Sequence, residues 1–286
     1  MCCITGSRVV HVSWTRIFAR ALDELHQGLV YAMELSADTS VAMVLPLPVP
    51  AGSADDAVRF VDLSVYSTFF ADLQRLWPPP AMPPQAFGAA RDPPHAAPLV
   101  VHQVGDFEAS FVPSPRDFTR LDRRFQLPSK LFEVIPHYRD WGFAVFQLRG
   151  LGGGAVGVIE RARRALGLAA PAPNRATEFH PMALVFPRRD PSTLFFPTVH
   201  VHDGDVHPLA DFHHQLYLQL DGDLGGDLQG WSASALPAKA AVDRSRAQGL
   251  VDGERPVHVR GLHGSRKNED VVVQVAPRPT GDRRVA

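Results

Sequence analysis

Apolar positions along this chain fall in short runs, many of them alternating with polar residues. The runs are rich in β-branched and aromatic residues and are bounded by proline, glycine and aspartate, a pattern typical of β-strands. The predicted strands are "SRVVHVSWTRIFAR", "QGLVYAMEL", "AVRFVDL", two within "PLVVHQVGDFEASFVPS", "WGFAVFQLR", "HPMALVFPRRD", "TLFFPTVHVHDG" and "HHQLYLQL". "SVAMVLPLPV" begins as a buried strand, but proline has no N–H to donate, so we expect it at a sheet edge or outside the sheet.

Helical spacing is confined to a few short segments. Apolar residues from Phe69 to Trp77 predict one helix, which ends at the following proline. Ser114 is expected to cap a second helix with Pro115 at its first position, and a third within "PSKLFEVIPHY" breaks at Pro136. Many strands and few helices, without regular βαβ alternation, predict an α+β fold with mainly antiparallel sheets.

Composition shifts divide the chain into four blocks. Residues 1–77 and 99–220 are expected to form the two halves of one α+β domain, joined by a loop over 78–98 that is rich in proline and alanine. Residues 221–286 are predicted to be a polar, partly disordered tail. Within that tail, "RPVHVRGLHGSRKNEDVVVQVA" resembles a strand pair around a turn, and we find no internal repeat.

The overall composition excludes several classes of protein. The chain has 286 residues, of which 45% are hydrophobic and 21% charged, as in soluble globular proteins. Its formal charge of -1 indicates no preference for nucleic acid or acidic lipid. Because no apolar run is long enough for a membrane and no signal-peptide pattern is present, we expect a cytoplasmic protein. The two cysteines, Cys2 and Cys3, are adjacent, so we expect free thiols and no disulfide framework.

Several segments resemble a known bacterial family. They are "CCI" at the start, "QGLVYAMEL", "VAMVLPLPVP", "FVDLSVYSTFFADL", "VVHQVGDFEASFVPSPRDFTRL" and "LPSKLFEVIPHYRDWGFAVFQLR". Together with "HPMALVF" and "LFFP" they are similar to domain of unknown function 2330, over most of Cys2 to Pro197. The chain departs from the family pattern at Ala42–Met43, which replaces a tryptophan region, and in its lack of an export signal. The shared motifs are strand patterns, so the resemblance implies a fold and no activity.

The stretch "TVHVHDGDVH" contains the best candidate for chemistry. In a strand, His200 and His202 project to one face, where two imidazoles can share a divalent ion such as Zn, Fe, Mn or Ni. We expect His214, and then His207, as the third ligand, and Asp205 to orient a ligand or deprotonate a bound water. The alternative is a partly solvated strand face that runs into a turn.

The histidine pattern matches known metal motifs only weakly. Cupins share His-x-His on a strand but need a glutamate soon afterwards, where this chain has Asp203 and Asp205. The His-x-His-x-Asp-His of metallo-β-lactamases has its aspartate at another position, and too little chain follows His202 for an amidohydrolase barrel.

Two further motifs are candidates for chemistry. If Met1 is removed, Cys2 becomes an N-terminal residue whose thiol is a candidate nucleophile, with its own α-amine as base. The segment 150–155 matches Gly-x-Gly-x-x-Ala, but no βαβ unit with a terminal acidic residue follows, which favours a flexible loop over a dinucleotide site. Signatures of serine hydrolases and P-loop proteins are absent from the sequence.

These observations leave three function classes open. The first, which we favour, is a soluble bacterial binding or interaction module without catalytic activity, which takes a protein or small-molecule ligand at an edge left by the Pro-x-Pro strand and has a histidine-rich metal site. The second is a metal-dependent hydrolase or oxygenase centred on His200 and His202. The third is an N-terminal-nucleophile hydrolase that uses Cys2.

Overall fold

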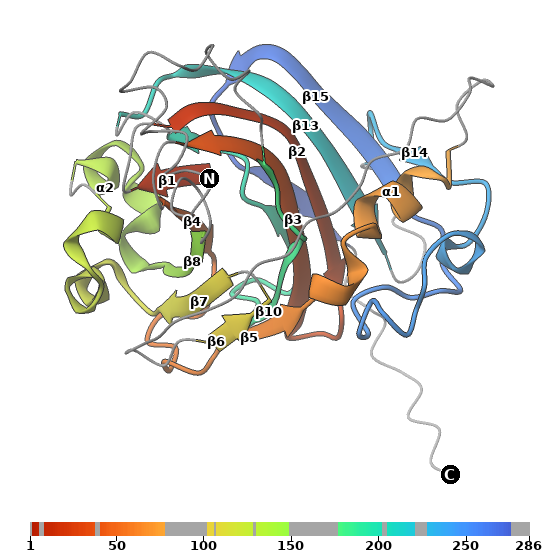
Figure 1. Cartoon of the computed structure of the whole chain (residues 1–286), viewed down its shortest axis with the longest axis horizontal. Coiled ribbons are helices and arrows are strands. Elements are labelled where there is room, and N and C mark those ends of the chain that lie inside the picture. Colours follow the sequence, from red (N-terminus) through yellow and green to blue (C-terminus); the bar gives the residue numbers. More distant parts are fainter. Residues whose placement is uncertain are drawn as a thin grey trace, which may run out of the picture.

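The computed structural model describes residues 2–5, 9–37, 41–77, 102–105, 107–127, 130–148, 177–201, 205–220 and 228–275. Strands dominate this part of the chain, helices are short, and most strand pairs are antiparallel (Figure 1). The predicted α+β class is therefore confirmed. Within these ranges no helix has both the length and the hydropathy needed to cross a bilayer.

The strands form two large sheets and one small one. Sheet 1 has the order β12-β1-β4-β8-β7-β6, sheet 2 has the order β14-β15-β13-β2-β3-β10-β5 with β9 paired to β3, and sheet 3 consists of β11 and β16. Among the described pairs only β1–β12 and β2–β13 are parallel.

The bounds of the strands follow. Sheet 1 contains β1 (Cys2–Thr5), β4 (Val41–Leu47), β6 (His102–Val104), β7 (Phe107–Val112), β8 (Gly142–Leu148) and β12 (His200–Val201). Sheet 2 contains β2 (Val9–Ala21), β3 (His26–Ala37), β5 (Arg59–Asp62), β9 (Thr177–Glu178), β10 (Met182–Pro187), β13 (Leu209–Gln219), β14 (Ser232–Ala233) and β15 (His258–Lys267). Sheet 3 contains β11 (Thr193–Phe196) and β16 (Val271–Gln274).

The helices are single turns or slightly longer, and many are of the 3-10 type. They are η1 (Ser64–Tyr66), α1 (Phe69–Gln74), η2 (Pro115–Arg120), η3 (Arg123–Phe125), α2 (Leu131–Val134), η4 (Pro136–Asp140) and η5 (Ala238–Ala240). The three predicted helices correspond to α1, to η2, and to α2 followed by η4. Ser114 precedes η2 as predicted, but its hydroxyl donates to the Asp117 carboxylate instead of capping the backbone.

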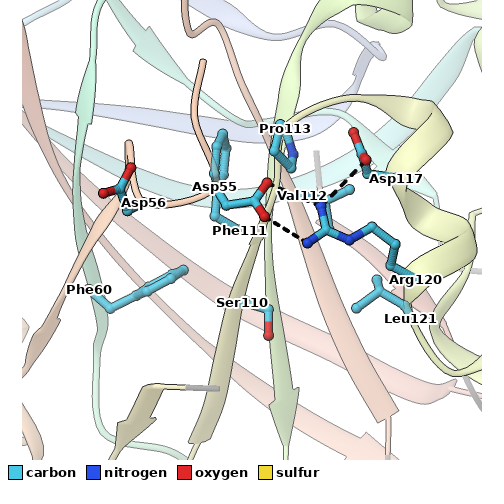
Figure 2. A pocket seen from close by; sticks show the side chains of 10 residues that line it. All are labelled: Asp55, Asp56, Phe60, Ser110, Phe111, Val112, Pro113, Asp117, Arg120 and Leu121. Atoms are coloured by element: carbon cyan, nitrogen blue, oxygen red, sulfur yellow. Dashed lines mark hydrogen bonds and ion pairs between the residues drawn. The ribbon is translucent and has the colours of Figure 1, made fainter. Parts of the chain in front are cut away.

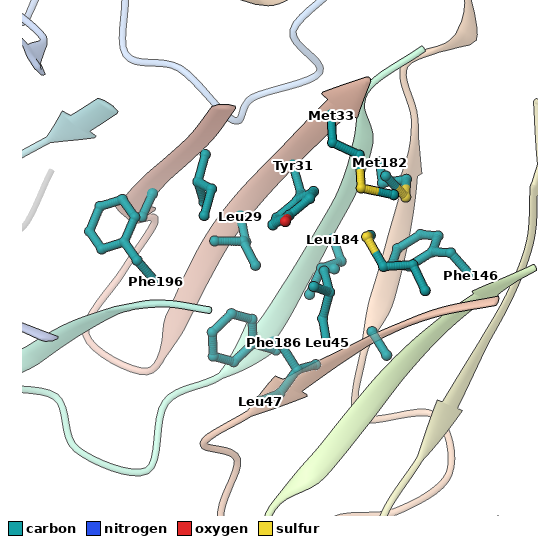
Figure 3. Close-up of a cluster of buried hydrophobic side chains, with 14 of the residues drawn as sticks. Leu29, Tyr31, Met33, Leu45, Leu47, Phe146, Met182, Leu184, Phe186 and Phe196 are labelled. Atoms are coloured by element: carbon teal, nitrogen blue, oxygen red, sulfur yellow. The ribbon is translucent and has the colours of Figure 1, made fainter. Parts of the chain in front are cut away.

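The main core lies between sheets 1 and 2 and contains side chains from both. Side chains of alternate strand residues point to opposite faces, so each strand contributes every second residue to this core. On β4, residues Val41, Met43, Leu45 and Leu47 join this central core, while Ala42 and Val44 join a second cluster on the outer face of sheet 1. The central core also contains Leu29, Tyr31, Met33, Phe146, Met182, Leu184, Phe186 and Phe196 (Figure 3). Full burial of each such side chain stabilises the fold by about 1.5–3 kcal/mol.

Both large sheets are covered on their outer faces. Sheet 1 packs against η2, η3, α2 and η4 through residues such as Phe118 and Tyr138. Sheet 2 packs against α1 and against residues 238–257 through residues such as Phe69 and Leu250. With both faces buried, the strands read as nearly continuous apolar runs.

Strand β4 corrects the prediction that its prolines would place it at an edge. It lies inside sheet 1, paired with β1 on one side and β8 on the other. Proline is tolerated because β1 pairs only with residues 42–44, so Pro46 has β8 alone as its neighbour. The prediction that this strand lies at a sheet edge or outside the sheet is therefore wrong.

Strands that follow each other along the chain do not always pair with each other. β10 pairs with β3 and β5 while β11 pairs with β16, so the turn over residues 188–191 connects two sheets and does not close a hairpin. Likewise β15 pairs with β13 and β14, and β16 belongs to sheet 3. The two strands within the expected tail are thus not partners of each other.

Residues 228–275 also differ from the expected polar tail, since they form three strands and part of the outer core. Six of them are buried against α1 and sheet 2, namely Ala238, Val242, Ala247, Leu250, Val251 and Val257. Their short apolar side chains are separated by polar residues, which hides them from a reading of composition. The expectations for residues 78–98, for the glycine run at 150–155 and for the last residues from 276 fall outside the described residues.

The side chain of Gln27 connects sheet 2 to sheet 3. The buried amide of Gln27 on β3 donates to the carbonyl of Phe195 at 2.7 Å and accepts from its N–H at 3.0 Å. These two hydrogen bonds join β11 to sheet 2 in place of a neighbouring strand's backbone.

Gly105 lies where there is no room for a side chain. Its φ is +56°, and a Cβ there would lie 2.3 Å from Nε2 of His180 and 2.6 Å from Cβ of Ser64.

Candidate metal centre

Two of the predicted ligands, His200 and His214, face each other across the gap between sheets 1 and 2. Their Nε2 atoms are 3.1 Å apart and their ring centroids are 4.7 Å apart. The ring of Phe212 lies against both, with centroids 4.7 Å from His200 and 5.1 Å from His214. Two imidazole nitrogens thus lie close together beside the ring of Phe212.

The alternation of β13 places His214 inside the molecule. Phe212, Leu216 and Leu218 point into the central core, and His214 occupies the same face with 1% of its surface exposed. Val199 and Val201 pack on the outer face of sheet 1, so His200 between them faces inward. A histidine at a core position needs a polar partner, and each of these rings meets the other.

Asn268 holds the backbone of His200 on both its donor and acceptor sides. Its side-chain oxygen accepts from the N–H of His200 at 2.7 Å, and its amide donates to the carbonyl of His200 at 2.9 Å. The same amide donates to the carbonyl of His207 at 3.0 Å, which keeps the backbone of that predicted ligand beside His200.

Asp270 fixes the residues that precede His200. One carboxylate oxygen accepts the N–H groups of Thr198 at 2.8 Å and Val199 at 3.1 Å. The other oxygen accepts the hydroxyl of Tyr138 in a short hydrogen bond. The backbone leading to His200 is therefore anchored to η4 and to the turn between β15 and β16.

The other predicted site residues are placed as follows. Asp205 is 57% exposed and pairs with Lys130 at 2.8 Å, an interaction that raises the pKa of the lysine. His207 lies on an exposed segment before β13. Cys2 lies on β1 in register with His200, but its side chain, like all of His202, lies outside the described part. The roles expected for these residues stay predictions.

Two other histidines on β13 and β15 form a separate pair. His213 and His263 are cross-strand neighbours on the outer face of sheet 2, exposed to solvent, with ring centroids 6.5 Å apart. They differ from His200 and His214 in face and burial, and so provide a natural control. His180, on a segment before β10, is buried, and its ring packs against that of Phe107 with the centroids 4.4 Å apart.

No pattern in the sequence indicates a role for Asn268 and Asp270 at this site. Both lie in a polar turn about 70 residues after His200, and the pairing of β16 with β11 and of β15 with β13 brings them back to it. Across the residues that the structure describes, no group of three or more His, Cys, Asp or Glu side chains converges as metal ligands.

Comparisons with known proteins found likeness in structure only. No family model matches, and no curated protein matches. The crystal structure of baculovirus P35 is similar with a TM-score of 0.47 and 11% identity, over 96% of this chain and 100% of that one. In the crystal structure of the caspase-8/P35 complex, the matching chain has a TM-score of 0.41 and 12% identity, over 92% of this chain and 96% of that one. Values this low support neither a shared function nor a shared site.

Proposed function

We propose that the protein is a binding protein in which His200 and His214 bind one divalent transition-metal ion. The observation that carries the proposal is the 3.1 Å separation of their Nε2 atoms. In a tetrahedral zinc site, Zn–N bonds of about 2.0–2.1 Å place two nitrogen ligands roughly 3.3–3.4 Å apart. The two rings need to separate by only a few tenths of an ångström to hold an ion.

The surroundings support the same reading. Asn268 fixes the backbone of His200, Asp270 fixes the two residues before it, and β13 fixes His214, so little backbone entropy is lost when both rings bind one ion. The ring of Phe212 keeps one side of the pair dry. Imidazole donors favour Zn, Fe or Ni over Mg or Ca. Water and His207, whose carbonyl shares Asn268 with His200, are the proposed remaining ligands.

A direct hydrogen bond between two neutral imidazoles is the competing explanation of the same distance. One ring would then donate from Nε2 and the other accept, and the pair would only satisfy two polar atoms beside the core. The two explanations differ in what added metal does, because a hydrogen-bonded pair has no requirement for an ion.

The test is a Zn²⁺ titration of untagged protein followed by calorimetry and metal analysis. We expect one ion per chain in the wild type, and affinity lower by about 100-fold or more in His200→Ala and His214→Ala, since loss of a ligand should exceed the 10–100-fold cost typical of losing a residue that orients one. Affinity should also fall with acid, because protons compete for imidazole nitrogen.

The matched control is the double variant His213→Ala/His263→Ala, which removes two exposed histidines from the other face of the same strands. It should bind as the wild type does. A wild type that binds no ion, or a control that loses as much affinity as His200→Ala, would contradict the proposal. His200 is only half-buried, so its alanine variant tests the ligand with little risk to the fold.

A further inference from the structure

A separate cavity of about 170 Å³ lies between the edge of sheet 2 and strand β7 of sheet 1. Its lining comes from the loop before β5, from β5 itself, from residues 110–113 and from η2 (Figure 2). It shares no residue with the histidine pair, so it is argued independently of the metal site.

The walls of the cavity are apolar and rigid. They are formed by Phe60, Phe111, Val112, Pro113 and Leu121. The ring of Phe60 packs edge-on against Phe146 of the central core at 5.4 Å. A Cβ on Gly142 would lie 2.5 Å from the ring of Phe111, so the glycine at the start of β8 leaves the space in which that ring is seated.

The rim of the cavity carries three carboxylates and one guanidinium. Arg120 donates to both oxygens of Asp55, at 3.1 and 2.6 Å, and lies 3.5 Å from Asp117 (Figure 2). The guanidinium lowers the pKa of Asp55, which keeps that carboxyl ionised. Asp56 forms no ion pair with any residue in the described ranges. The cavity therefore has an excess of negative charge, and one carboxylate is available to a ligand.

The size of the cavity limits its occupant. Sites for drug-sized ligands and cofactors usually measure about 300–1,000 Å³, so this one suits a single large side chain. Two phenylalanine rings offer flat surfaces for a planar cation, and a carboxylate fork matches a guanidinium in two parallel hydrogen bonds. The pair of Arg120 with Asp55 shows that geometry at the rim itself.

We propose that this cavity is a docking site for an arginine side chain of a partner protein, with the guanidinium paired to Asp56 and the aliphatic stem against Phe60 and Phe111. Arginine is common among the anchoring residues of protein interfaces, where it fills such pockets. Lysine lacks the planar fork and gains less from the rings.

The test is a titration of ¹⁵N-labelled protein with N-acetyl-L-argininamide, monitored by NMR. We expect shifts confined to residues 55–60 and 110–121, with a Kd on the order of 1 mM for so small a probe. N-acetyl-L-citrullinamide, which has the same shape without the charge, should cause no saturable shifts, and N-acetyl-L-lysinamide should bind more weakly. Equal binding of the citrulline or lysine probe, or shifts elsewhere, would overturn the proposal.

The variant Asp56→Asn should weaken the arginine probe about fivefold, as expected for one exposed charge. Asp211→Asn is the control, because this exposed aspartate lies on β13, four strands away from β5 in sheet 2, or roughly 19 Å. It should leave the Kd unchanged. If Asp56→Asn binds the probe as tightly as the wild type, Asp56 does not hold the guanidinium and the proposal is wrong.

Discussion

Gly105→Ala is expected to lower the free energy of unfolding by about 3 kcal/mol, from backbone strain and overpacking together. The left-handed φ of +56° is costly for any residue with a Cβ. The new methyl group would also lie 2.3 Å from Nε2 of His180. That ring has little room to move, because it is buried and packs against the ring of Phe107 with the centroids 4.4 Å apart.

The control for this variant is Gly52→Ala. Gly52 has φ +77° but no atom within 4 Å of the place where a Cβ would lie. It therefore carries the backbone cost alone, about 1–2 kcal/mol. Urea unfolding of both variants measures the difference between them, which is the steric cost of crowding His180. Equal losses in the two variants would show that the packing around His180 can relax.

Gln27→Leu is expected to cost about 2–4 kcal/mol. Leucine has a similar volume, but it would leave the buried N–H and C=O of Phe195 without the partners that the Gln27 amide supplies. The loss should be concentrated where β11 meets sheet 2, so amide hydrogen exchange of residues 193–196 should accelerate along with the drop in global stability.

The control is Gln74→Leu, on the exposed side of α1, which should change the unfolding free energy by no more than about 0.5 kcal/mol. A Gln27→Leu protein as stable as this control would mean that the paired amide contributes nothing net to the contact between β11 and sheet 2.

The apolar and period-two patterns were enough to predict most of the longer strands but not their partners. On β4 alternate residues pack into two different clusters, and burial on both faces explains why "VAMVLPL" is apolar throughout. Pairing depends on contacts between distant segments, such as the parallel pair of β2 and β13, for which local pattern carries no signal. Proline on β4 misled the prediction because its tolerance depends on how far the neighbouring strand β1 extends.

The sequence indicated two residues of the candidate site but not that they meet. Spacing along one strand suggested His200, and density of histidine suggested His214. Their meeting depends on β12 and β13 lying in different sheets that face each other, which the sequence does not reveal. Asn268 and Asp270 act through backbone groups, so their residue types alone did not indicate a role.

The central claim is that Nε2 of His200 and Nε2 of His214 coordinate one metal ion. It can be tested by NMR of protein that carries ¹⁵N-labelled histidine and is loaded with ¹¹³Cd²⁺ as a substitute for zinc. Scalar coupling from one cadmium nucleus to Nε2 of both His200 and His214 is the result that we predict, with no coupling to His213 or His263. Coupling to neither His200 nor His214, with their nitrogens instead sharing a proton when cadmium is present, would contradict the account.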